Sequence, residues 1–164
     1  SITLWPHGIL FRDSEADMRR QMVEADLVEC VIGLGPNLFY NSPMEACLLI
    51  TSTNKPEERR DKVLIINAVK EVRQDKNIGF LEEGHIIKIF NSYKAFQDET
   101  GFSKVISVEK IIENKGSLNI AQYVSNVAPD REQLSVDEAF LRWEESSREL
   151  NKSMADLFRI LDQK

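Results

Sequence analysis

The chain contains little cysteine and histidine, and this scarcity argues against disulfide and metal stabilisation. Only two cysteines and two histidines occur among 164 residues, whereas a disulfide scaffold needs more cysteines. Cys30 and Cys47 each lie inside an apolar run, so we predict two buried, reduced thiols. His7 and His85 are far apart, and neither a Cys-x-x-Cys nor a His-x-x-x-His spacing occurs, so we predict no metal site.

Long apolar runs and an excess of positive charge are also lacking. No apolar run approaches the roughly 18 residues of a membrane-spanning helix, and no basic start precedes an apolar stretch. We therefore predict a cytoplasmic protein without a membrane partner. The 21 Lys and Arg against 27 Asp and Glu leave a net charge of −6, which argues against a broad basic face for nucleic acid.

Apolar runs and helix-capping residues predict alternating strands and helices, as in an α/β domain. Strands are predicted at 27–34, 46–51, 62–69 and, as a short piece, 105–107. Helices are predicted at 13–25, 82–93 and 108–114, the first capped by Asp13 or Ser14 and the last by Ser107. Residues 2–11 predict the end of a buried strand followed by a turn. Four apolar residues of the second helix share one face: Ile86, Ile89, Phe90 and Tyr93.

The segment 35–45, between the first two predicted strands, is the most informative part of the sequence. One Gly, two Pro and two Asn exclude regular structure there. Leu38, Phe39 and Tyr40 nevertheless place large apolar side chains where an exposed connection is normally polar. The loop therefore either covers the core or binds a ligand, and Asn37 is either a functional amide or a turn residue.

The end of the chain predicts an amphipathic helix at 134–164, separated from residues 1–125 by a linker at 126–133. Ser135 and Glu138 form a Ser-x-x-Glu capping box. Apolar residues follow in alternating steps of four and three, which only Ser147 interrupts. This seam consists of Val136, Phe140, Trp143, Leu150, Met154, Leu157 and Leu161. Such a seam packs either on its own domain or on another chain, and both alternatives remain open.

Seven short runs, spread in order along residues 1–125, carry a resemblance: Pro6-His7-Gly8-Ile9-Leu10-Phe11-Arg12, Leu27-Val28-Glu29-Cys30-Val31-Ile32-Gly33-Leu34, Pro36-Asn37-Leu38-Phe39-Tyr40, Ala46-Cys47-Leu48-Leu49-Ile50, Lys62-Val63-Leu64-Ile65-Ile66-Asn67-Ala68, Gly101-Phe102-Ser103-Lys104-Val105-Ile106-Ser107 and Leu118-Asn119-Ile120-Ala121-Gln122-Tyr123-Val124. In order and spacing they resemble the modification (methyltransferase) subunit of type I restriction-modification systems. The resemblance implies the C-terminal part of a class I, Rossmann-like methyltransferase sheet, with a terminal β-hairpin and then an α-helical tail.

The same resemblance implies methyl transfer from S-adenosylmethionine to the exocyclic amino group of adenine in DNA. The runs at 27–34 and 46–50 look like the hairpin whose loop carries an aromatic that stacks on the flipped-out base. Phe39 is the residue in register, Tyr40 is the alternative, and Asn37 lies beside them. Stacking on an aromatic returns about 1 to 3 kcal/mol, against the few needed to unstack a base.

The implied partners are a DNA-reading specificity subunit, a restriction subunit, and DNA in the assembled complex. The tail seam would dock on the specificity subunit through Phe140, Trp143, Leu150, Met154, Leu157 and Leu161. For the chain alone in solution, self-association through this seam is the other expectation.

Two motifs of that family have no counterpart in this sequence: the glycine-rich Asp-Pro-x-Cys-Gly-Ser-Gly and the catalytic Asn-Pro-Pro-Phe/Tyr. We therefore expect the C-terminal portion of a longer protein, inactive alone, without catalytic or cofactor-binding residues of its own. The loop departs from the family pattern too, since Asn41-Ser42-Pro43-Met44-Glu45 replaces Gly-Thr-Gly-x-Pro, and Gly35-Pro36 replaces Pro-Pro. The alternatives are a non-catalytic interaction module or part of a methyltransferase with a non-DNA substrate.

Overall fold

The computed structural model describes residues 1–39, 42–76, 78–124, 140, 143–144 and 147–148. The chain divides into two units, Ser1–Ala128 and Pro129–Lys164. The strands of the first unit are β1 (Ile2–Pro6), β2 (Val28–Leu34), β3 (Ala46–Thr51), β4 (Lys62–Ala68), β5 (Arg73–Asp75), β6 (Ile78–Phe80) and β7 (Ser103–Ser107). Its α-helices are α1 (Ala16–Glu24), α2 (Glu83–Ala95), α3 (Val108–Glu113) and α4 (Ile120–Tyr123), and its 3-10 segments are η1 (His7–Leu10), η2 (Asp13–Glu15) and η3 (Glu57–Arg59).

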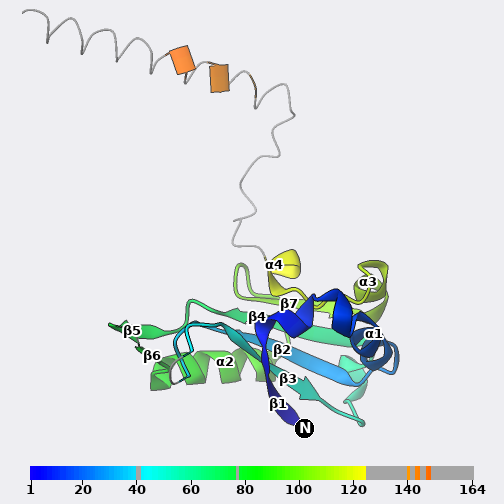
Figure 1. Ribbon diagram of the computed structural model, residues 1–164. Coiled ribbons are helices and arrows are strands. Elements are labelled where there is room, and N and C mark those ends of the chain that lie inside the picture. Colours follow the sequence, from blue (N-terminus) through cyan, green and yellow to red (C-terminus); the bar gives the residue numbers. More distant parts are fainter. Residues whose placement is uncertain (40–41, 77, 125–139, 141–142, 145–146, 149–164) are drawn as a thin grey trace, which may run out of the picture. The chain divides into compact units, whose positions relative to one another are not determined.

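Five strands form one mixed sheet in the order β1-β3-β2-β4-β7 (Figure 1). β2 and β4 run parallel, whereas β3 is antiparallel to both β1 and β2. The carboxyl ends of β1, β2 and β4 therefore lie at one edge of the sheet, which we call the carboxyl edge. The predicted hairpin is confirmed, because β2 and β3 pair from Cys30↔Ile50 to Leu34↔Ala46 and place the loop 35–45 at this edge.

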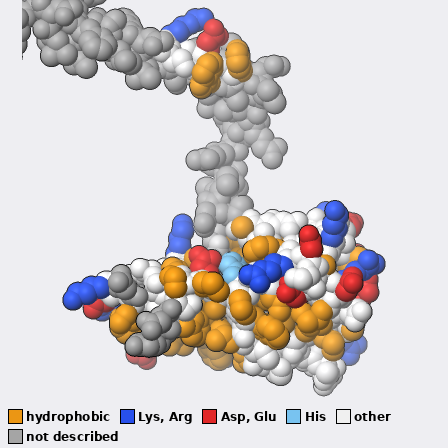
Figure 2. Space-filling view, in the orientation of Figure 1, with side chains coloured by type: hydrophobic (Ala, Val, Ile, Leu, Met, Phe, Trp, Pro, Cys, Tyr) orange, Lys and Arg blue, Asp and Glu red, His pale blue; other side chains and the backbone are white. Residues whose placement is uncertain are grey.

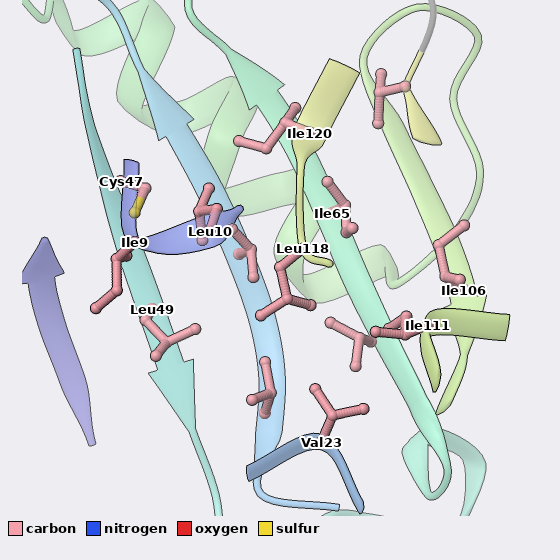
Figure 3. Packing of buried hydrophobic residues seen from close by; sticks show 14 of the residues in the cluster. Ile9, Leu10, Val23, Cys47, Leu49, Ile65, Ile106, Ile111, Leu118 and Ile120 are labelled. Atoms are coloured by element: carbon pink, nitrogen blue, oxygen red, sulfur yellow. The ribbon is translucent and has the colours of Figure 1, made fainter. Parts of the chain in front are cut away.

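Helices cover both faces of the sheet, and this explains why every residue of β2 is buried. Leu10, Val23, Ile111 and Ile120 bring η1, α1, α3 and α4 against one face, where they meet side chains such as Ile65 (Figure 3). On the opposite face, α2 packs Ile89, Tyr93 and Phe96 against a second cluster, which contains Cys30, Ile32, Leu64 and Ile66.

The prediction of a buried first strand was wrong. All five residues of β1 are exposed, including Leu4 at 50% and Trp5 at 38%. β1 is the edge strand of the described sheet and pairs only with β3. Figure 2 shows hydrophobic side chains gathered over this side of the molecule.

The predicted face of α2 was also only half right. Ile89 and Tyr93 pack on the core, but Ile86 and Phe90 are 53% and 56% exposed. The helix instead buries a stripe that continues to Phe96, so it is rotated away from the predicted face.

Three further details differ from the predictions. At the first helix, η2 precedes α1, whose N-cap Glu15 makes no side-chain cap hydrogen bond. The polar segment after β4 forms a separate two-stranded hairpin, β5–β6, and a short helix, α4, follows α3.

The predicted cap of α3 is confirmed, because the Ser107 side chain accepts a hydrogen bond from the Lys110 N–H.

The two cysteines are free and buried, as predicted. Burial raises the pKa of the Cys30 thiol far above its ordinary range and that of Cys47 to about 11. Both are therefore inert core thiols at neutral pH.

In the second unit the structure describes part of the predicted tail helix. Phe140 and Trp143 are helical and 61% and 63% exposed, and their ring centroids are 5.8 Å apart. Arg148 pairs with Glu144 at 3.0 Å, one turn apart. The linker 126–133, the capping box and the seam residues Val136, Leu150, Met154, Leu157 and Leu161 lie outside the described residues.

Candidate target-base loop

The apolar residues of the loop at the carboxyl edge lie in different environments: Leu38 packs on the core, and Phe39 is partly exposed. Leu38 is half-buried and packs against the core cluster beneath α2. Phe39 is 37% exposed and accepts a hydrogen bond at its carbonyl from the Ser42 N–H, at 3.0 Å. Tyr40 lies outside the described residues. The two interpretations of the loop thus apply to different residues: Leu38 covers the core, and Phe39 stays accessible.

The first end of the loop is held by close backbone approaches. Asn37 has a left-handed backbone, with φ at 61°, and its carbonyl accepts a 2.8 Å hydrogen bond from the Gly79 N–H of β6. Asn adopts this conformation more readily than most residues, and the backbone of Asn37 is that of a turn residue. A Cβ on Gly79 would lie 2.7 Å from the Pro36 carbonyl oxygen. The β5–β6 hairpin is therefore packed directly against the loop.

The second end of the loop is held by His7, which follows β1. The His7 backbone N–H donates to the Glu45 carbonyl at 3.3 Å, and His7 Nδ1 lies 3.0 Å from Glu45 Oε2. The side chains of His7 and Glu45 are 21% and 40% exposed. His7 Nε2 is buried and has no hydrogen-bond partner among the described residues.

A polar hollow of about 330 Å³ lies beside the carboxyl end of β4. Its lining includes Lys70, Glu99 and a Lys88–Glu71 ion pair, with the Lys88 ammonium 4.1 Å from the centre of the Phe102 ring. Two lysines and two glutamates line it, so its formal charges cancel. In the described part of the chain, no group of three His, Cys, Asp or Glu side chains is placed to hold a metal ion.

These features define a class: an α/β chain with a mixed sheet and an aromatic-bearing hairpin loop at its carboxyl edge. A family model described as N-6 DNA methylase matches residues 2–132. The chain belongs to the N-6 DNA methylase family.

Among the described residues, no helix is both long and apolar enough to cross a membrane.

Relatives agree with this assignment. The chain is 40% identical over 129 residues to the type I restriction enzyme MjaVIII methylase subunit of Methanocaldococcus jannaschii, covering 76% of this chain and 22% of that protein. It is 40% identical over 121 residues to the MjaVII methylase subunit of the same organism, covering 71% and 21%. The chain thus spans about a fifth of the length of these curated relatives.

One solved structure is similar to this chain in both fold and sequence. The methyltransferase subunit of a type I restriction-modification system from Streptococcus thermophilus matches with a TM-score of 0.70 at 35% identity. The match covers 76% of this chain and 26% of that one. The five-stranded mixed sheet with its helices therefore corresponds to part of a type I methyltransferase structure.

S-adenosylmethionine, which the family implies, does not fit the glycines of the described residues. The nearest approach to a glycine-rich turn is Gly33-Leu34-Gly35, but protein atoms fill both positions where a side chain is missing. A Cβ on Gly33 would lie 2.5 Å from Ile120, and one on Gly35 would lie 2.6 Å from the Val69 carbonyl oxygen. These glycines allow close packing and form no cradle for a ligand.

The structure thus places Asn37 and Phe39 together in one turn. It also reveals two loop anchors that sequence reasoning missed, His7 with Glu45 and Gly79 with Asn37. Nothing in the sequence linked the members of either pair; His7 and Glu45, for example, are 38 residues apart and meet only through the pairing of β1 with β3.

Proposed function

We propose that this chain is a portion of the DNA adenine-specific methyltransferase subunit of a type I restriction-modification system. In this proposal the longer protein binds S-adenosylmethionine, which supplies the methyl group transferred to the exocyclic amino group of adenine. Residues 1–125 form the C-terminal part of its Rossmann-like sheet, 126–133 a linker, and 134–164 a docking helix. The chain alone is inactive, since it holds neither the cofactor motif nor the catalytic motif.

The observation that carries this proposal is the accessible Phe39 side chain on a loop anchored at both ends. An exposed aromatic offers a π-face to an extruded base, and stacking is worth about 1 to 3 kcal/mol per base. Phe39 follows the anchored Asn37, and its carbonyl accepts from the Ser42 N–H, so its backbone is already restrained when a base arrives. The role of this chain is therefore to bind and orient the target base, while the rest of the protein performs the transfer.

The edge strand β1 supports the proposal that this chain is a portion of a larger sheet. Its outer edge has no partner among the described strands, and Ile2, Leu4 and Trp5 are exposed beside it. A longer protein would pair this edge and cover these side chains. The family match favours DNA over a non-DNA substrate.

Changing Phe39 to Ala in the full-length enzyme, assembled with its specificity subunit, tests the base-stacking role. Loss of about 1 to 3 kcal/mol of stacking predicts that kcat/KM for adenine methylation falls by about 5- to 150-fold. The fluorescence of a 2-aminopurine placed at the target position would show less extrusion. Phe39→Trp should retain most activity.

Phe90→Ala is the matched control, because Phe90 is also an exposed phenylalanine but lies on α2. It should leave methylation unchanged. If Phe39→Ala changed neither the methylation kinetics nor the response to a mismatched target base, the stacking role would be refuted.

We further propose that the tail helix docks on the specificity subunit. Phe140 and Trp143 form an exposed aromatic pair on this helix, and large aromatics are frequent anchors of interfaces. Deleting residues 134–164 from the full-length protein should abolish co-purification with that subunit, and Trp143→Ala should weaken binding by about 30-fold or more. Arg148→Ala, which removes a charge beside the seam, is the matched control and should have little effect. Unchanged binding after the deletion would exclude docking by this helix, whereas a tail that binds by itself would favour an interaction module.

A further inference from the structure

We propose that His7 and Glu45 form a positioning pair that fixes the second end of the target-base loop and thereby sets the orientation of Phe39. This inference rests on the proposed function, because it assigns the pair a purpose in handling the target base. Neither residue is proposed to touch the base or the transferred methyl group.

The pair lies where the loop meets the sheet. The β1–β3 ladder ends at Pro6↔Ala46. His7 directly follows β1 and Glu45 directly precedes β3, so they are the next residues beyond this end of the ladder. They continue the ladder by one backbone hydrogen bond of 3.3 Å and add a side-chain contact of 3.0 Å. Two contacts between the same two residues restrain both position and rotation at this point.

The pair complements the anchor at the other end of the loop. The Gly79 N–H holds the Asn37 carbonyl at 2.8 Å, so Phe39 lies between two fixed points supplied by different strands. β6 supplies the first anchor and the residue after β1 supplies the second. The Phe39 carbonyl also accepts from the Ser42 N–H at 3.0 Å, three residues before Glu45. Phe39 is therefore restrained from both sides before a base arrives, which lowers the cost of ordering it on binding.

The chemistry of the pair explains why a histidine suits this position. His7 Nδ1 lies 3.0 Å from Glu45 Oε2, and an N–H on Nδ1 donates to this carboxylate, which orients the ring. Nε2 is buried and has no hydrogen-bond partner among the described residues. The contact to Glu45 is therefore the polar contact that orients the ring in the described part of the chain.

A double-mutant cycle in the full-length, assembled enzyme tests this proposal. His7→Ala, Glu45→Ala and the double variant are compared for methylation kinetics and for 2-aminopurine fluorescence at the target position. Each single variant should lower kcat/KM about tenfold. The double variant should be no less active than the less active single variant, because the two substitutions remove the same contact. Glu45→Gln, which retains an acceptor for Nδ1–H, should restore most of the activity.

α2 contains a matched control pair. There Glu82 and His85 form a capping box, in which His85 Nδ1 accepts from the Glu82 N–H at 3.2 Å. His85→Ala removes a histidine contact of the same kind from an element outside the loop. It should leave kcat/KM and the 2-aminopurine signal unchanged. An equal loss with His85→Ala would overturn the proposal, because any histidine contact would then suffice.

Hydrogen exchange of the loop amides without DNA separates this proposal from the proposed function. Faster exchange in His7→Ala, together with slower methylation, supports both. Faster exchange with unchanged methylation, and an inert Phe39→Ala, would retain the pair as a loop anchor and refute the base-handling role. Unchanged exchange and unchanged methylation in His7→Ala, with Phe39→Ala impaired, would overturn the positioning pair alone.

Discussion

Replacing Arg59 by Met is expected to lower the free energy of unfolding by about 3 to 5 kcal/mol, the usual cost of breaking a buried ion pair. Arg59 Nη1 lies 2.8 Å from Glu29 Oε1, and the two side chains are only 16% and 8% exposed. The Arg59 guanidinium also lies 4.6 Å from the centre of the Phe96 ring and 5.3 Å from that of Tyr93. Without Arg59, the Glu29 carboxylate keeps, among the described side chains, only the Tyr93 hydroxyl as a partner, at 2.9 Å.

The double variant Arg59→Met and Glu29→Met should recover most of this loss, because it leaves no buried charge. Urea unfolding of the wild type, the single variant and the double variant measures both effects. Arg20→Met is the control: its i,i+4 pair with Glu24 is largely exposed, so solvent screens it and little change is expected. A single variant at Arg59 as stable as the wild type would contradict the argument.

Replacing Gly35 by Ala is expected to destabilise the protein by about 1 to 3 kcal/mol, as overpacking of a core position does. Gly35 is buried at the base of the loop, and a Cβ there would lie 2.6 Å from the Val69 carbonyl oxygen and 2.7 Å from Val72 Cγ1. The carbonyl belongs to the backbone and cannot rotate away as a flexible side chain does. The loop must therefore shift, so methylation by the full-length enzyme should fall together with stability.

Gly84→Ala is the matched control for this substitution and should change stability in the opposite direction. Gly84 lies in the first turn of α2, and a Cβ there would meet nothing within 4 Å. Ala is the better helix former, so a gain of about 0.5 kcal/mol is expected from thermal or urea unfolding. Equal stability of Gly35→Ala and Gly84→Ala would show that the close approach at Gly35 is not restrictive.

The central strands were predicted well from the sequence because strands buried on both faces consist mainly of apolar residues. β2, β3 and β4 are apolar runs, covered on both faces, and their observed bounds lie within one residue of the predicted ones. The first strand was predicted as buried for the same reason, yet the described residues leave β1 exposed. Composition reports what a strand would bury and contains no information on which neighbours are present.

The loop shows a second limit of sequence reasoning. Leu38 and Phe39 are adjacent and both apolar, but only Leu38 packs on the core. Their separation depends on the left-handed backbone at Asn37 and on its hydrogen bond to Gly79, 42 residues away. The His7–Glu45 contact likewise joins residues 38 apart. Contacts of this range follow from strand order, which single residues and their spacing do not specify.

The open edge of β1 has a consequence for handling the protein. A purified sample of residues 1–164 offers a row of unpaired backbone groups, flanked by Leu4 and Trp5, to every other copy in solution. Such edges promote strand-to-strand association between molecules. Turbidity and oligomer size that rise with concentration would then include association through β1 as well as through the tail seam, and a variant with a charged residue at Leu4 would separate the two.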